Sequence, residues 1–303
     1  MAEMTGRCLC GAVTYTARDV ERLWDMDPAC LDHRLTPGER REFDERGCFV
    51  VRNVLPRDLV ARLEDAADRL DAENRPPGDT RPINHIDCIG YDDAFLELLE
   101  WPKTIARVID ILGWHIQLYH SHVMVTPPLP EGYVSKPRRI GWHRDSGRLN
   151  LDLEGNPRVS LKVGFFLTDT SEEDRGNFHY IPGSHLEKSL EFPAADVEEH
   201  PDATPVCAAA GDALFFDRRL WHARGRNRSR VTRKVVFLGY SYRWLRPRDN
   251  MTVDRYLAGA DPIRRQLLGA SPTGGFGYTS PSEEDIPLRA WLVEQLGEDA
   301  VAP

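Results

Sequence analysis

The sequence lacks the features of membrane, secreted and nucleic-acid-binding proteins. No apolar run approaches the roughly 20 residues that a membrane-spanning helix needs, and the first residues lack the apolar core of a signal peptide. The 6 cysteines in 303 residues show no disulfide-scaffold spacing. A net charge of −9 argues against nucleic acid or an anionic membrane as the general partner. We therefore expect a soluble, cytoplasmic protein that acts on a small molecule.

Several common catalytic patterns are also absent. The chain has no internal repeat, no glycine-rich loop that would cradle a phosphate and no Ser or Cys nucleophile motif. Its length suits a single enzyme domain with a sizeable core, and no second core is needed. The sequence leaves the oligomeric state open. Any chemistry must come from other residue types, and histidines and carboxylates are the first candidates.

Two short stretches contain residues that bind metal ions. His143 and Asp145 form a His-x-Asp pair, and His222 lies far downstream, after the apolar run 212–217 that predicts a buried strand. Side chains two apart on an extended strand point to the same face, so His143 and Asp145 can reach one ion. Two histidines and one carboxylate form the ligand set of non-haem Fe(II) oxygenases, which leave other metal positions for oxygen and an organic cosubstrate.

Arg233 begins the next apolar run, residues 234–240. A guanidinium at this position can bind the far carboxylate of a dicarboxylic cosubstrate through two parallel hydrogen bonds. Each signal alone is weak, because an isolated His-x-Asp is common by chance and Arg233 lies in a cluster of arginines that would ordinarily be solvated. The joint pattern indicates an oxygenase.

The order of these motifs resembles the phytanoyl-CoA dioxygenase family. Residues 176–185, Gly-Asn-Phe-His-Tyr-Ile-Pro-Gly-Ser-His, are similar to the signature that lies between the two halves of that family's metal site. Residues 43–55 resemble its opening strand and the entry to its first helix. The likeness extends from about Leu35 to Trp244. It implies an α+β, mainly β fold: a double-stranded β-helix, or jelly-roll, cupin-like barrel, braced by outer α-helices.

The resemblance also implies cofactors and a reaction. His143, Asp145 and His222 would bind Fe(II), and Arg233 would bind the distal carboxylate of 2-oxoglutarate. With O2 the enzyme would hydroxylate an unactivated C–H bond of a small metabolite or natural-product intermediate and release succinate and CO2. Asp145 favours hydroxylation, because halogenating relatives carry a small residue at this position.

Two other classes of protein fit the same barrel. A cupin-type hydrolase or isomerase would use zinc or manganese, would turn over without oxygen and would not need Arg233. A catalytically silent binding protein would keep the barrel alone, although the intact ligand set argues against silence.

Substrate contacts are predicted at a few further positions. His120 and His122 share one face of the predicted strand 117–125 with Leu118 and Met124, and His122 is the favoured contact, with a packed core histidine as the alternative. The basic loops 127–140 and 146–158 would attract an anionic substrate, and a solvated basic rim is the alternative. The candidate substrate residues are His122, Arg148, Lys162 and Trp221.

Three regions are expected along the chain: an N-terminal extension (1–34), the barrel (35–248) and a C-terminal helical extension packed on the same domain (249–303). Apolar spacing, prolines and glycines predict helices at 56–70, 93–99, 104–112, 262–268 and 287–296. Cys8 and Cys10 resemble a strand of the glutathione-dependent formaldehyde-activating zinc family. No further cysteine pair completes a four-ligand zinc site, so a loosely ordered extension is the favoured interpretation.

Overall fold

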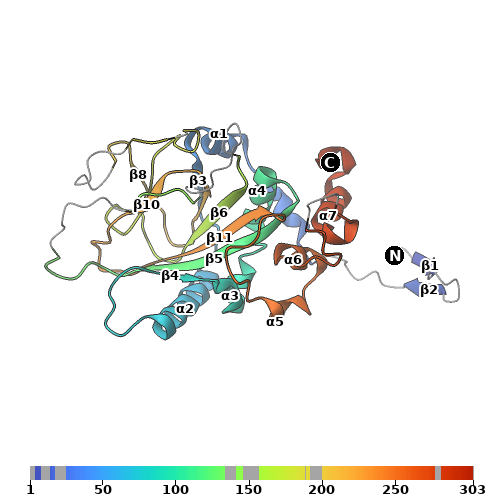
Figure 1. Cartoon of the computed structure of the whole chain (residues 1–303), viewed down its shortest axis with the longest axis horizontal. Coiled ribbons are helices and arrows are strands. Elements are labelled where there is room, and N and C mark those ends of the chain that lie inside the picture. Colours follow the sequence, from blue (N-terminus) through green and yellow to red (C-terminus); the bar gives the residue numbers. More distant parts are fainter. Residues whose placement is uncertain are drawn as a thin grey trace.

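The computed structural model describes residues 4–7, 14–17, 25–133, 141–145, 157–187, 189–191, 200–276 and 281–302. Within these ranges two antiparallel sheets lie against each other, and helices cover the outer face of the larger one (Figure 1). The larger sheet contains, in spatial order, β3 (Cys48–Val51), β9 (Ala213–Asp217), β6 (Ser160–Phe166), β11 (Arg233–Tyr242), β5 (Ile116–Thr126) and β4 (Ile83–Ile86).

The smaller sheet has three strands, β10 (His222–Arg224), β7 (Phe178–Tyr180) and β8 (Thr204–Val206). A separate hairpin pairs β1 (Met4–Arg7) with β2 (Thr14–Ala17). Cys8 and Cys10 lie outside the described residues, so the interpretation of that segment stays a prediction.

Alternation along the strands of the larger sheet produces two cores. On β11, Val236 and Leu238 face the helices, whereas Val235 and Phe237 face the smaller sheet. Successive side chains of a strand point to opposite faces, so on β6 the same rule turns Lys162 toward the smaller sheet and its neighbour Leu161 toward the helices. The space between the two sheets is where the polar residues of the large sheet gather.

The prediction that Leu118 shares a face of β5 with His120, His122 and Met124 is wrong, because a β-bulge interrupts the strand. The pairing of β5 with β11 matches His120 with Gly239 but Leu118 with Tyr240, so Tyr119 is an extra residue in the ladder. The bulge reverses the alternation at this point. His120 faces the cavity between the sheets, while Leu118 packs with Tyr240 in the helix-side core.

The predicted helices are present, with small differences at their ends. They are α2 (Arg57–Asn74), α3 (Asp93–Glu97), α4 (Pro102–Leu112), α6 (Pro262–Leu267) and α7 (Pro287–Leu296), to which the structure adds α1 (Pro37–Arg46), α5 (Asp254–Leu257) and the 3-10 turns η1 (Pro28–His33), η2 (Cys88–Gly90), η3 (Glu283–Asp285) and η4 (Glu298–Ala300). No helix in the described part of the chain combines the length and apolar character that crossing a membrane requires.

Both extensions make contacts with the helix-side core. Arg107 of α4 donates to the carbonyl of His33 at the end of η1, and Cys30 of η1 is buried. At the other end of the chain, Gln266 of α6 donates to the carbonyls of Trp114 and Ile116 at the start of β5. The division into regions 1–34, 35–248 and 249–303 stays a prediction.

The carboxyl group of Glu100 is expected to make stability fall as the pH rises. Burial, only partly offset by its ion pair with Arg264, raises its pKa from 4.5 to about 7. A folded-state pKa above the unfolded one contributes stability that is complete below pH 4.5 and is lost as the pH rises through 7. Between pH 5 and pH 8 this loss amounts to about 2–3 kcal/mol, at 1.36 kcal/mol per pKa unit.

Urea unfolding at pH 5 and pH 8 tests this expectation. Glu100→Gln should lose less stability than the natural chain across that interval, by roughly the same amount. Glu97→Gln, which removes an exposed carboxylate of the adjoining helix, is the control and should keep the natural slope. Equal slopes for all three proteins would contradict the prediction.

Candidate active site

The three predicted ligands meet in one place, although His143 does not lie on a full strand. His143 forms a single β-bridge with His222, with the two backbone N–H groups each donating to the other residue's carbonyl at 3.0 Å. The backbone N–H of Asp145 donates to the carbonyl of Arg218. These short pairings replace the expected strand, yet they give the extended geometry that turns both side chains to one side.

The ligand atoms of His143, Asp145 and His222 lie within 4.8 Å of one another. Each histidine directs Nδ1 at a backbone carbonyl, Gly141 at 2.8 Å for His143 and Leu220 at 2.9 Å for His222. The hydrogen bond at one ring nitrogen fixes the tautomer, so the proton stays on Nδ1 and the lone pair of Nε2 is available to a metal ion. The donor set therefore fits a divalent metal of the iron type.

His222 is held in an aromatic setting. Its ring stacks on Phe178, with centroids 5.1 Å apart, and meets Phe216 edge-on. Burial lowers its pKa to about 4, despite the opposing effect of Asp145. The imidazole is therefore neutral near pH 7, as metal binding requires.

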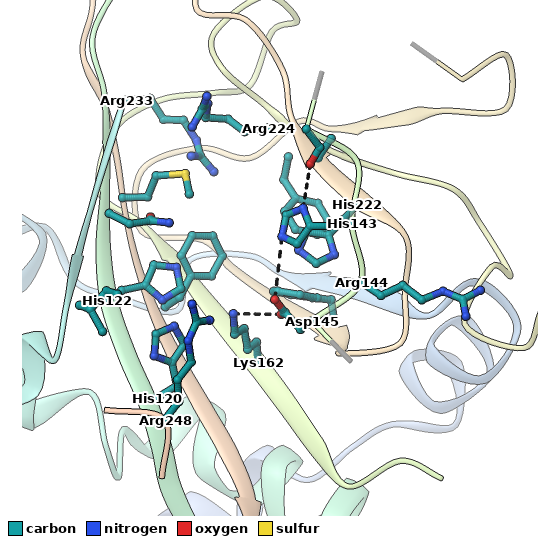
Figure 2. Close-up of a pocket in the computed structure, with 18 residues that line it drawn as sticks. His120, His122, His143, Arg144, Asp145, Lys162, His222, Arg224, Arg233 and Arg248 are labelled. Carbon is teal, nitrogen blue, oxygen red and sulfur yellow. Dashed lines mark hydrogen bonds and ion pairs between the residues drawn. The ribbon is translucent and has the colours of Figure 1, made fainter. Parts of the chain in front are cut away.

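Lys162 lines the cavity and lies directly beside Asp145. Its Nζ is 2.9 Å from Oδ2 of Asp145, and both side chains are buried (Figure 2). Burial alone raises the pKa of Asp145, but the charges of Lys162 and His222 outweigh it and hold the carboxyl well below its usual range. Because Lys162 occupies Oδ2, the other oxygen, Oδ1, is the one directed at His143, 3.9 Å from its Nε2.

Arg233 enters the same cavity from the first position of β11. It is 2% exposed, and within the described residues its Nε and Nη1 have no hydrogen-bond partner and it forms no ion pair. Burial and the nearby charge of Arg224 lower its pKa to about 9. A buried guanidinium without a carboxylate is costly, so this arrangement indicates a site for an anion that the described residues do not supply.

A glycine of the signature segment makes room for this arginine. Gly176 has φ +73°, and a Cβ atom there would lie 3.2 Å from Cδ of Arg233. Asn177 next to it donates to three backbone carbonyls, those of Thr170, Glu172 and Val206. The signature segment therefore shapes the walls of the site and supplies no metal ligand.

Two further signature residues, Ser184 and His185, make hydrogen bonds near the β-bridge between His143 and His222. Ser184 accepts a hydrogen bond from the backbone N–H of Trp221, and His185 contacts the backbone carbonyl of Asp44 through Nε2. Downstream, Asn227 donates to the carbonyls of Thr126 and Val231 and so fixes the turn between β10 and β11. This turn sets the position of Arg233 relative to His222.

The ligands and Arg233 line a cavity of about 570 Å³ between the two sheets (Figure 2), within the range of small-molecule sites. Of the predicted substrate residues, His122 and Lys162 line it. Trp221 does not line it; its ring lies under the guanidinium of Arg144, 5.1 Å from the centroid. Arg148 lies outside the described residues.

His122 is buried and makes two ring stacks. Its centroid lies 4.6 Å from that of His120 and 4.9 Å from that of Phe237. Burial first, and then the charge of Lys162, lowers its pKa well below 6.5. Within the structure's described ranges its Nδ1 has no hydrogen-bond partner.

Sequence reasoning missed two arginines of the cavity. Arg224, two residues after His222 on β10, points to the same side as that ligand, as the period of a strand requires. That signal was present in the sequence but was read as part of a solvated cluster. Arg248 comes from the segment after β11, and no local pattern points to it.

A family model supports this interpretation of the site. Residues 43–235 match the model described as phytanoyl-CoA dioxygenase (PhyH). The chain belongs to the phytanoyl-CoA dioxygenase family, a family of Fe(II)/2-oxoglutarate-dependent dioxygenases. This confirms the resemblance predicted from the motifs.

Two relatives show how far the similarity extends. Peroxisomal phytanoyl-CoA dioxygenase of Mus musculus is 22% identical over 241 residues, which cover 68% of each chain. Rv1501 of Mycobacterium tuberculosis, an uncharacterised protein, is 28% identical over 146 residues, 48% of this chain and 50% of that protein. This chain thus spans about half the length of that relative.

The fold is shared with HygX of Streptomyces hygroscopicus, solved with nickel, 2-oxoglutarate and hygromycin B bound. The TM-score is 0.57 and the identity 20%, over 70% of this chain and 90% of HygX. The predicted double-stranded β-helix braced by helices is therefore confirmed.

Proposed function

We propose that the protein hydroxylates an unactivated C–H bond of a small organic molecule. In this proposal His143, Asp145 and His222 are the ligands of Fe(II). Arg233 binds the distal carboxylate of 2-oxoglutarate. The observation that carries the proposal is the buried, unpaired guanidinium of Arg233 in the same cavity as two histidines and a carboxylate.

Iron(II) with 2-oxoglutarate and O2 supplies the oxidant for C–H hydroxylation, with release of succinate and CO2. The chain's own residues bind and orient. Lys162 holds one oxygen of Asp145, so this carboxylate presents the other oxygen to the metal. The aromatic rings of Phe178 and Phe216 enclose His222, and Phe237 adds a further apolar wall to the cavity.

The alternatives explain less of the site. A cupin-type hydrolase or isomerase, or a silent binding protein, would account for the barrel but would leave Arg233 buried without a role. HygX was solved with 2-oxoglutarate and an organic natural product bound, which supports a small organic substrate for this chain too.

An anaerobic titration of the metal-free full chain with Fe(II) and 2-oxoglutarate tests the proposal. We expect the weak visible charge-transfer band of an iron-chelated keto acid in the natural chain and in His33→Ala, a histidine of η1 outside the cavity. His143→Ala should show no band, because a ligand is lost. Iron binding without any band in the natural chain would refute the assignment of the cosubstrate.

A further inference from the structure

We propose that the organic substrate carries an anionic group, a carboxylate or a phosphate-type group, and that Arg248 is the residue that binds it. This inference rests on the proposed function and adds the class of substrate and the end of the cavity at which its charged group lies.

Basic side chains outnumber acidic ones among the described residues that line the cavity. Its lining presents Lys162, Arg224, Arg233 and Arg248 against a single carboxylate, Asp145, among the residues that the structure describes. A fifth basic residue, Arg144, turns its guanidinium away to the carbonyls of Ser184 and Glu187 (Figure 2).

Loading the site leaves this excess of positive charge in place. The two positive charges of Fe(II) and the two negative charges of 2-oxoglutarate cancel each other. His120 and His122 add nothing near pH 7, because burial lowers the pKa of both. A cavity with several uncompensated cations attracts anions and disfavours cations, so the third component that enters it should be negatively charged.

Arg248 lines the cavity at a distance from the site proposed for the cosubstrate. Figure 2 shows it beside His120 and Lys162, at the end of the cavity away from Arg233 and Arg224. An anion bound there does not compete with the cosubstrate at Arg233. The metal ligands lie to the side of the space between these two ends, so a substrate held at Arg248 extends its carbon skeleton toward them.

Contacts with β5 hold the segment that carries Arg248 in place. The backbone N–H of Arg248 donates to the carbonyl of Tyr119 at 2.8 Å. The adjacent Asp249 is buried and accepts from His120 Nδ1 and from the backbone N–H of Ser121, both at 2.5 Å. Asp249 is thus engaged with β5, and Arg248 forms no ion pair within the described ranges. The backbone of Arg248 is therefore held in place, and its exposed side chain is accessible to an anion.

His122 supplies a second polar group between the two ends. It is 5% exposed, lines the cavity and has an unpartnered Nδ1. A neutral imidazole carries one N–H donor and one acceptor. It can therefore hydrogen-bond to a polar atom of the substrate without adding charge, while Arg248 provides the charged contact.

Isothermal titration calorimetry on the full chain tests the inference with three six-carbon probes, hexanoate, hexyl phosphate and hexan-1-ol. The protein is first loaded with nickel, the ion present with 2-oxoglutarate in HygX, and with 2-oxoglutarate. We expect at least one anionic probe to bind at one site and to bind at least about 10-fold more tightly than hexanol, as a charged hydrogen bond implies. The preferred anion identifies the head group as a carboxylate or a phosphate.

The variants separate this inference from its premise. Arg248→Gln should weaken the affinity for the anionic probe about 10-fold or more and leave the affinity for hexanol unchanged. Arg246 is an exposed arginine outside the cavity, so Arg246→Gln should bind all three probes like the natural chain. Unchanged anion binding in Arg248→Gln, or no preference for anions in the natural chain, overturns the inference. Failure of nickel and 2-oxoglutarate to load overturns the proposed function instead, and it is recorded in the first step.

Discussion

Succinate formation is abolished in Asp145→Ala, with a rate at least about 1,000-fold below that of the natural chain. Without the carboxylate the two histidines do not complete the ligand set for Fe(II), and a loss of about 4 kcal/mol of transition-state stabilisation corresponds to this factor at 1.36 kcal/mol per tenfold. The reaction is followed as O2-dependent conversion of 2-oxoglutarate to succinate in the presence of Fe(II). Asp202→Ala, which removes an exposed carboxylate, is the matched control and should keep the natural rate.

A second variant separates chemistry from folding. Removing the carboxylate leaves Lys162, which is buried, without its partner, and breaking a buried pair destabilises a protein by about 3–5 kcal/mol. Asp145→Asn keeps the shape and one oxygen near Lys162 but lacks the negative charge. We expect it to fold, as judged by circular dichroism and thermal unfolding, and still to form no succinate. A folded Asp145→Asn enzyme with full activity would show that Asp145 is not a metal ligand.

The apparent KM for 2-oxoglutarate rises in Arg233→Gln, by roughly 10- to 100-fold, since a hydrogen-bonded ion pair contributes about 1.5–3 kcal/mol. Arg233→Lys should recover only part of the loss, because a lysine cannot form the two parallel hydrogen bonds of a guanidinium. The measurement is the initial rate of succinate release at increasing 2-oxoglutarate with Fe(II) saturating.

The control for Arg233 is Arg230→Gln, since Arg230 is exposed and does not line the cavity. Its KM should equal that of the natural chain. If Arg233→Gln also kept the natural KM, the cosubstrate would have to be bound elsewhere, and Arg224 would be the first residue to test.

The sequence predicted the grouping of His143, Asp145 and His222 from a local rule, and it predicted the fold from the order of its motifs, which resembles that of the phytanoyl-CoA dioxygenase family. The His-x-Asp spacing places two side chains on one face of extended backbone, and a single β-bridge is enough to enforce it. Arg233 was predictable from its place at the start of an apolar run, which became β11. The helix signals of α2 and α4 also acted locally, through apolar spacing and prolines at helix starts.

The parts that the sequence did not predict depend on contacts between distant segments. The bulge at Tyr119 exists only in the pairing of β5 with β11, and it places the side chains of Leu118 and His120 on opposite faces of the sheet. Arg248 reaches the cavity because a buried Asp249 binds to β5, more than a hundred residues earlier in the chain. Lys162 lines the cavity as predicted, but its ion pair with Asp145 was not predicted, because that contact depends on the packing of β6 beside the ligand segment.

The unequal exposure of the two ligand histidines has a consequence for how the ion is exchanged. The side chain of His143 is 55% exposed, whereas His222 is enclosed by Phe178 and Phe216. A metal ion held by the three side chains would be shielded on the side of His222 and Asp145 and open to solvent on the side of His143. Chelators and competing divalent ions would therefore approach the site from the side of His143, and this histidine would be the ligand most open to exchange.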